Sequence, residues 1–253
     1  MTRQAAFAFV ILAATSGGLS AQSENRVESK DSVTVSAGIP REQLALEAEL
    51  GGIVSQADRS VAAGSSSDAI AQYRKAIDFV QKHPVLAERE ETVQKKLARA
   101  CLYGNRVGEA VSIYAKLLEA RKSDCAPSSP ALAGCADAQY ELAVAEMTGS
   151  DFSAAIPLLQ QAEANYSTAG KFASSSHDLV MIQRKNEAQT SMMIAVSLAR
   201  TGKTVDAIKA IRDAISGLQT VQSDLTINIG IRNDAAASLQ QANVVLSRLN
   251  TTQ

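Results

Sequence analysis

Four segments of the chain repeat one order of small, large and apolar positions. Each contains an alanine, a large residue four positions later and another apolar residue seven positions later. Positions 0, 4 and 7 lie on one face of an α-helix, so each segment is predicted to be a helix that packs closely against a neighbour. The alanines that mark the four segments are Ala69, Ala110, Ala155 and Ala207.

A second helical pattern precedes each of these segments. A large residue followed by a small one lies 13 and 12 positions before the marker alanine, as in Leu97–Ala98, Leu142–Ala143 and Ile194–Ala195. The first unit holds the weaker pair Gln56–Ala57 at these positions. Each unit is therefore predicted to be two antiparallel helices with a tight turn between them, where glycine provides the left-handed cap. The predicted turns lie at Gly64, Gly104–Asn105, Gly149–Ser150 and Gly202.

These units resemble the tetratricopeptide repeat (TPR) family. That family combines a large–small pair in the first helix with glycine near the turn, alanine and a large residue in the second helix, and often proline after it. Pro84 and Pro127 follow the second helices of the first two units. The marker alanines are 41, 45 and 52 positions apart, compared with about 34 in the family, and the family's early aromatic residue is absent. The resemblance implies an all-α fold, a right-handed solenoid of about four antiparallel helix pairs; an unrelated array of alanine-rich helices is the alternative.

The ends of the repeat pattern define the predicted domains. The repeat domain is predicted at residues 40–222. Residues 223–253 are predicted to form a C-terminal capping helix and tail, because a solenoid needs a last helix over its exposed end. Asn233 or Asp234 would cap this helix, which would run through Leu249, although residues 225–231 look briefly like a strand.

The N-terminus has the order of features typical of a cleavable secretory signal. Arg3 precedes ten apolar residues, and small residues follow. The apolar run is shorter than the roughly 20 residues that a membrane span needs. The signal peptide is predicted to be residues 1–21, with cleavage after Ser20 as the competing site and a buried N-terminal helix as the other interpretation. Residues 22–39 would then be a flexible tether, and the mature protein, without a membrane span, would lie in the periplasm or outside the cell.

Charge and composition argue against several classes of function. The formal net charge is −1, from 25 basic and 26 acidic residues, which provides no electrostatic footprint for nucleic acid. Two histidines and three cysteines offer little material for a metal or nucleophile site, and zinc-protease, Cys-x-x-Cys and Gly-x-Ser-x-Gly motifs are missing. His83 and His177 are interpreted as surface residues. The sequence therefore favours a non-catalytic protein without a metal or cofactor.

The cysteines predict one disulfide bond. An exported protein occupies an oxidising compartment, where disulfides persist. Cys125 and Cys135 lie ten positions apart across a turn-rich stretch that holds Pro127 and Pro130. A bond between them would close the connection between the second and third units and contribute about 2–3 kcal/mol. Cys101 lies on an apolar helix face and is interpreted as a free, buried thiol.

The TPR resemblance also implies a binding groove. In that family the first helices line a concave groove that receives an extended or helical peptide. Helical phase places Asp58 of the first unit on this side of the repeat, together with nine further residues. These are Lys95, Arg99, Tyr103, Tyr140, Val144, Met147, Met192, Val196 and Arg200. The set is basic in the second unit and mostly apolar in the third and fourth, and packing against a neighbouring helix is the alternative role for each side chain.

These patterns together predict an exported helical-repeat scaffold that binds a protein or peptide partner in its groove. The alternative belongs to a different class, a small-ligand-binding sensor or carrier domain of the cell envelope. An enzyme is the least favoured interpretation.

Overall fold

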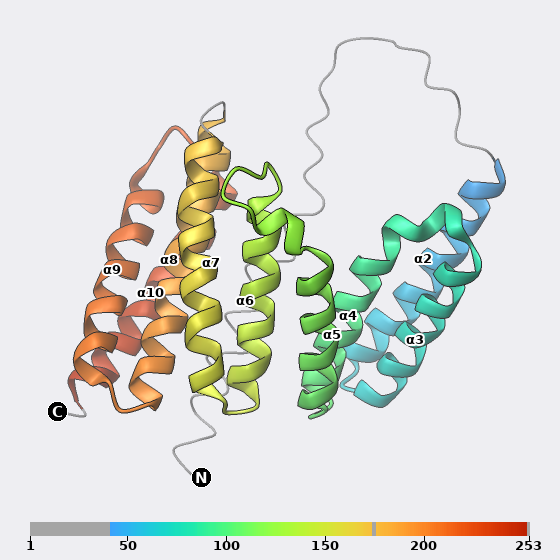
Figure 1. The fold of residues 1–253 in the computed structure, drawn as a ribbon, viewed down its shortest axis with the longest axis horizontal. Coiled ribbons are helices and arrows are strands. Elements are labelled where there is room, and N and C mark those ends of the chain that lie inside the picture. The colour runs from blue at the N-terminus through green and yellow to red at the C-terminus, as the bar shows by residue number, and fades with distance from the viewer. Residues whose placement is uncertain (1–40, 174–175, 252–253) are drawn as a thin grey trace. The chain divides into compact units, whose positions relative to one another are not determined.

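Helices make up nearly all of the described chain. The computed structural model describes residues 41–173 and 176–251, and in these residues it contains nine α-helices, α2 to α10, and no strand (Figure 1). Helix accounts for 87% of this part of the chain, which confirms the all-α prediction. The predicted signal peptide and tether lie outside the described residues. Across 41–173 and 176–251, every helix is too short or too polar to cross a bilayer.

The described chain divides into two compact units. The N-terminal unit ends at Leu117 and the C-terminal unit begins at Leu118, so the division falls inside α5. In the N-terminal unit, α2 packs on α3 and α3 packs on α4. Its segments are α2 (Arg41–Ala62), α3 (Ser66–Lys82), the 3-10 segment η1 (Pro84–Arg89), α4 (Glu90–Tyr103) and α5 (Val107–Ala120).

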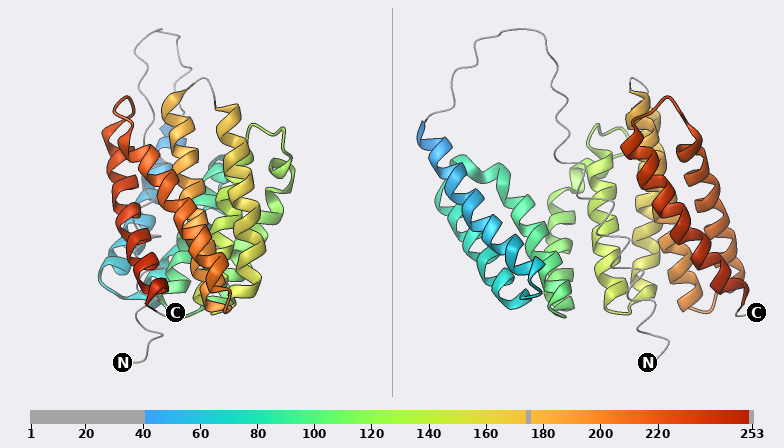
Figure 2. Two further views of the ribbon diagram at one scale, coloured as in Figure 1. Left: turned by 90° about the vertical axis from the view of Figure 1, so that its left-hand side faces the viewer. Right: turned by 180° about the vertical axis from the view of Figure 1, so that it is seen from behind.

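In the C-terminal unit each helix packs on the next one along the chain, from α6 to α10 (Figures 1 and 2). Helix α8 also contacts both α6 and α10, so it has neighbours on several sides. The segments are the 3-10 turn η2 (Lys122–Cys125), α6 (Leu132–Thr148), α7 (Phe152–Phe172), α8 (His177–Arg200), α9 (Thr204–Ser223) and α10 (Ile229–Asn250).

The marker alanines lie at the helix contacts that the pattern predicted. All four of them are fully buried. In α7 and α9 the positions four and seven residues further on are fully buried as well, and they belong to the continuous apolar core of the C-terminal unit. Those residues are Leu159, Ala162, Ile211 and Ala214. Helices approach closely elsewhere in this unit too, because a Cβ placed on Gly217 of α9 would lie 2.9 Å from the Cβ of Ala188 on α8.

Two of the four predicted turns differ in detail from the glycine caps expected. Gly64 and Gly202 take positive φ values of 74° and 82°, as predicted. In the other two turns the left-handed residue is the one after the glycine, Asn105 at 57° and Ser150 at 69°. Gly104 serves another purpose, because a Cβ there would lie 3.2 Å from the Cβ of Ser66 and 3.3 Å from the carbonyl oxygen of Ala100.

The last helix begins earlier than its sequence suggested. The side chain of Asn228 accepts a hydrogen bond of 2.8 Å from the backbone N–H of Gly230 and caps α10 at Ile229. The predicted cap at Asn233 or Asp234 is therefore wrong by about one and a half helical turns. The apparent strand at residues 225–231 forms the turn and first residues of α10 instead. Short polar caps such as Asn228 override the local β-propensity of a few aliphatic residues.

Candidate functional site

The nine residues predicted to line a groove fall into two groups in the structure. Lys95 and Arg99 are partly exposed on α4, and Tyr103 at its end is 44% exposed. Arg200 at the end of α8 is also exposed, and its guanidinium lies 5.2 Å from the centroid of the Phe152 ring. These four side chains lie where a partner has access to them.

The other five predicted groove residues are buried in the core of the C-terminal unit. None of them is more than 7% exposed. They are Tyr140, Val144 and Met147 on α6, and Met192 and Val196 on α8. Because α6 and α8 are covered by neighbouring helices, these side chains pack in the interior and do not offer a surface to a peptide.

A polar network in the N-terminal unit connects α2, α3 and α4, the helix that carries Lys95, Arg99 and Tyr103. The Lys96 ammonium on α4 donates to both carboxylate oxygens of Asp58 on α2, at 2.8 and 2.9 Å. The hydroxyl of Tyr73 on α3 donates to the same carboxylate. This network fixes the face of α4 on which Arg99 and Tyr103 lie.

The Tyr73 hydroxyl is buried and bonded to a carboxylate. Burial raises the pKa of the Tyr73 hydroxyl, and the hydrogen bond to Asp58 raises it further. The positive charge of Arg99 acts in the opposite direction, and Tyr103 also interacts with this hydroxyl. Tyr73 therefore remains a neutral donor to Asp58 at physiological pH.

We call this region the α4 surface. It comprises Lys95, Lys96, Arg99 and Tyr103 of α4 with Asp58 and Tyr73. Lys95 pairs with Glu91 at 3.1 Å and Lys96 pairs with Asp58. The carboxylates of Glu91 and Asp58 thus lie against Lys95 and Lys96, so the surface is less basic than the sequence indicated. Sequence reasoning missed Lys96 and Tyr73, because their partner Asp58 is distant along the chain.

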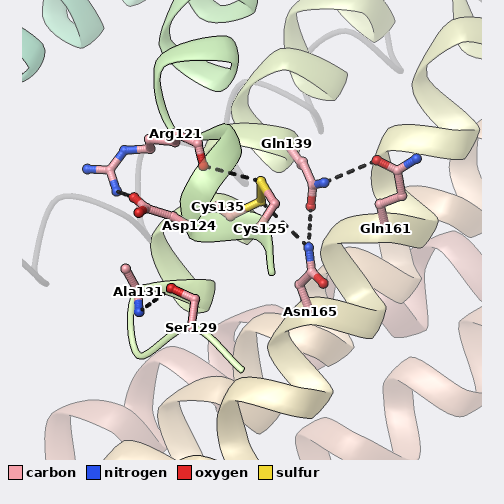
Figure 3. The surroundings of a disulfide bond; sticks show 9 residues. All are labelled: Arg121, Asp124, Cys125, Ser129, Ala131, Cys135, Gln139, Gln161 and Asn165. Carbon is pink, nitrogen blue, oxygen red and sulfur yellow. Dashed lines mark hydrogen bonds and ion pairs between the residues drawn. A yellow bond between two sulfur atoms is a disulfide. The ribbon is translucent and has the colours of Figure 1, made fainter. Parts of the chain in front are cut away.

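The predicted disulfide bond is present at the start of the C-terminal unit (Figure 3). It joins Cys125 at the end of η2 to Cys135 in α6, with 5.2 Å between their Cα atoms. One polar side chain of α7 lies against it, since Asn165 approaches the Cys135 sulfur at 3.7 Å and donates to Gln139 of α6 at 2.9 Å. Cys101 is buried and free, as predicted, and burial raises the pKa of its thiol to about 11.

The C-terminal unit also contains a cleft of about 790 Å³, which sequence reasoning did not find. Side chains of the three consecutive helices α7, α8 and α9 line it, and we call it the α7–α9 cleft. Its charged lining residues are Glu163, Lys171, Arg184, Glu187 and Asp213. Burial raises the pKa of the Glu187 carboxyl and the nearby Glu163 carboxylate raises it further, while the Ser167 hydrogen bond, Arg184 and Lys171 lower it.

Metal-binding side chains are dispersed over the described part of the chain. Within residues 41–173 and 176–251, no three histidine, cysteine or acidic residues are grouped so that they hold a metal ion. The α4 surface and the α7–α9 cleft both carry hydrogen-bonding groups and charges of both signs.

Comparisons with known proteins agree on the fold. No family model matches the sequence, and no match is found among curated proteins. A solved structure of a Podosopora anserina protein, described as a putative kinesin light chain with nearly identical TPR-like repeats, is similar at a TM-score of 0.52. Its sequence identity is 18%, and the match covers 80% of this chain and 94% of that one. BtubC (BKLC) from P. vanneervenii is similar at a TM-score of 0.54, with 16% identity and 83% and 82% of the two chains covered. The chain therefore has a TPR-like helical-repeat fold.

Proposed function

We propose that this protein is an exported helical-repeat scaffold that binds a protein or peptide partner through the α4 surface. The observation that carries the proposal is the exposed Tyr103 beside Arg99, on a helix face held by the Asp58–Tyr73–Lys96 network. Tyrosine and arginine are enriched among the residues that dominate binding energy. Because the network joins three helices, it holds the helix face that carries Tyr103 and Arg99 in one arrangement. A preorganised surface loses less conformational entropy on binding.

The fold supports the same role. Repeated helix pairs present extended surfaces, and proteins of this architecture use them for binding. The proposed role requires no catalytic step, and the two nucleophilic groups near the α4 surface are not activated. Tyr73 and Cys101 are both shifted towards their neutral forms, because burial raises the pKa of each.

The charge of the α4 surface favours an acidic segment in the partner. Three cations against two carboxylates leave a surplus of one positive charge among Lys95, Lys96, Arg99, Glu91 and Asp58. Carboxylates of a partner would be attracted by the net positive charge of this group, with the exposed Tyr103 providing apolar and hydrogen-bonding contact. The expected partner is an acidic peptide segment with an aliphatic or aromatic residue next to its charges.

Site-specific photo-crosslinking tests this proposal directly. A photoreactive phenylalanine derivative placed at position 103 should trap a distinct partner from the cell envelope. The same group at position 205 in α9, where the natural valine is 78% exposed, serves as the matched control. A product specific to position 103 is expected, and identical products at both positions would contradict a binding role for the α4 surface.

Reversing two charges should weaken the interaction with the partner so identified. Lys95 and Arg99 lie one turn apart on α4, so Lys95→Glu with Arg99→Glu acts on one patch. We expect the association rate constant to fall about 10-fold at low salt and the difference to shrink at high salt, since surface charges act mainly on encounter. Stopped-flow or surface-plasmon measurements at two ionic strengths check this.

The matched control for that pair is Lys75→Glu with Lys82→Glu, two exposed positions of α3 in the same unit. It makes the same change in net charge and should leave the association rate within about twofold of the parent. If both pairs slow association equally, only net charge matters and the α4 surface has no specific role.

Export is supported by the N-terminal signal pattern and by the disulfide bond, since such bonds persist in oxidising compartments. The mature protein should begin at Gln22 and be recovered from the periplasm or the medium with Cys125 and Cys135 oxidised. N-terminal sequencing and mass spectrometry of fractionated cells check this. A full-length, reduced chain in the cytoplasm would overturn the proposed localisation.

One observation favours the second function, a small-ligand sensor or carrier. The α7–α9 cleft, at about 790 Å³, falls within the range of small-molecule sites. The α7–α9 cleft belongs to the C-terminal unit and the α4 surface to the N-terminal unit, so each function can be tested by variants of its own unit.

A further inference from the structure

We propose that the α7–α9 cleft binds a short peptide of three or four residues by its two charged termini. The free amino group would lie at the end of the cleft formed by Glu163, Ser191 and Asp213, and the free carboxylate at the end formed by Lys171 and Arg184. This site is separate from the α4 surface and goes beyond the proposed scaffold function.

The positive end of the cleft is located by a close helix contact. A Cβ on Gly170 of α7 would lie 3.4 Å from the Cβ of Gln183 on α8, so these two residues are at the same level. Lys171 and Arg184 are their immediate neighbours in sequence, and both line the cleft. One ammonium and one guanidinium group therefore line this end of the cleft.

The negative end is located by two further contacts. The Ser191 hydroxyl of α8 donates to the Glu163 carboxylate of α7, which places these residues opposite one another. On α9, Gly217 is at the level of Ala188 of α8. Helices α8 and α9 are antiparallel (Figure 1). Asp213, one turn before Gly217 in α9, therefore lies near the level of Ser191, which is about one turn after Ala188 in α8. Two carboxylates and a buried hydroxyl thus face this end.

The spacing of the two ends sets the length of the ligand. Along α7, Glu163 and Lys171 are eight residues apart, which is about 12 Å at the helical rise. Along α8, Ser191 and Arg184 are seven residues apart, which is about 10 Å. An extended peptide spans roughly 3.3–3.6 Å per residue, so three or four residues match this distance.

The middle of the cleft suits a peptide backbone. Ser167 and Ser216 supply hydroxyl groups, and Gly170 and Gly217 leave room beside them. Glu187 lies between the two ends, where Glu163 disfavours its ionised form and Arg184 and Lys171 favour it. An ammonium group bound beside Glu163 would relieve the repulsion between these two carboxylates, so binding of a cation at the negative end is favoured by charges already present.

Isothermal titration calorimetry of the full chain with alanine peptides tests the proposal. Trialanine and tetra-alanine with free termini should bind, and dialanine should bind at least 10-fold more weakly because it cannot reach both ends. N-acetyl-trialanine and trialanine amide should each lose at least 10-fold in affinity. Each of these peptides lacks one terminal charge while keeping the same backbone length.

Two variants assign the termini to the ends of the cleft. Arg184→Gln should abolish most of the preference for a free carboxylate and retain the preference for a free amine, and Glu163→Gln should do the reverse. The amide that replaces the Glu163 carboxylate keeps an oxygen to accept from Ser191, so the fold is retained, as circular dichroism would check. Lys203→Gln and Asp206→Asn, exposed positions outside the cleft, are the matched charge controls and should behave as the parent.

Three results would overturn the proposal. These are no binding of trialanine or tetra-alanine at millimolar concentration, equal affinity for free and capped peptides, or equal effects of the cleft and control variants. Lys95→Glu with Arg99→Glu should leave trialanine binding unchanged, so the failure of this inference and the failure of the proposed scaffold function are distinguishable.

Discussion

Replacing Leu159 with alanine is expected to lower the free energy of unfolding by about 2–5 kcal/mol. Leu159 lies in the middle of α7, is fully buried and belongs to the apolar core of the C-terminal unit. The substitution removes buried methyl groups and leaves a cavity, since the surrounding α6 and α8 side chains relax only partly. Urea denaturation followed by far-ultraviolet circular dichroism at 25 °C measures the change.

Leu225→Ala is the matched control for this truncation. The same atoms are removed at a position that is 76% exposed in the turn before α10, so the expected change is within about 0.5 kcal/mol. Equal denaturation midpoints for the two variants would contradict the placement of Leu159 in the core.

Removal of the disulfide bond should lower the free energy of unfolding by about 2–3 kcal/mol. Cys125 and Cys135 close a short ring that ties η2 to α6, and the bond reduces the number of conformations open to the unfolded chain. The Cys125→Ser, Cys135→Ser double variant should therefore unfold at a lower urea concentration than the oxidised parent protein.

A reductant provides the chemical control. Dithiothreitol should move the midpoint of the parent protein to that of the double variant and leave the double variant unchanged, since the remaining thiol of Cys101 is buried and protonated. A parent midpoint that is insensitive to reductant would show that the bond is not formed or does not stabilise the fold.

The sequence by itself determined the helices, the disulfide bond and the pairing of α2 with α3, α6 with α7 and α8 with α9. An alanine followed by apolar residues four and seven positions later identified one face of each of these helices. In the structure the marker alanines Ala110, Ala155 and Ala207 are fully buried. These are local properties, because the helical period and the small size of alanine act within a few turns of one chain segment. The cysteine pair was predictable for the same reason, since its members are only ten positions apart.

The tertiary structure alone decided which faces remain accessible. Helical phase assigned Tyr140, Met147 and Met192 to a groove, but phase identifies a face of a helix and not what covers it. Helices α6 and α8 have neighbours on more than one side, so these side chains lie in the apolar core of the C-terminal unit. Lys95 and Arg99 remain partly exposed and Tyr103 is exposed, so this face of α4 is accessible.

Both candidate sites depend on residues that are distant in sequence. Lys96 and Asp58 are 38 positions apart, and Ser191 and Glu163 are 28 apart. Lys96 and Asp58 lie on α4 and α2, on either side of α3, whereas Ser191 and Glu163 lie on the adjacent helices α8 and α7. Each pair meets only because helices of particular lengths bring these levels together, and the long spacing between repeats had left those lengths open. The local pattern of apolar residues therefore predicts the helices, whereas the packing of complete helices determines the polar network and the cleft.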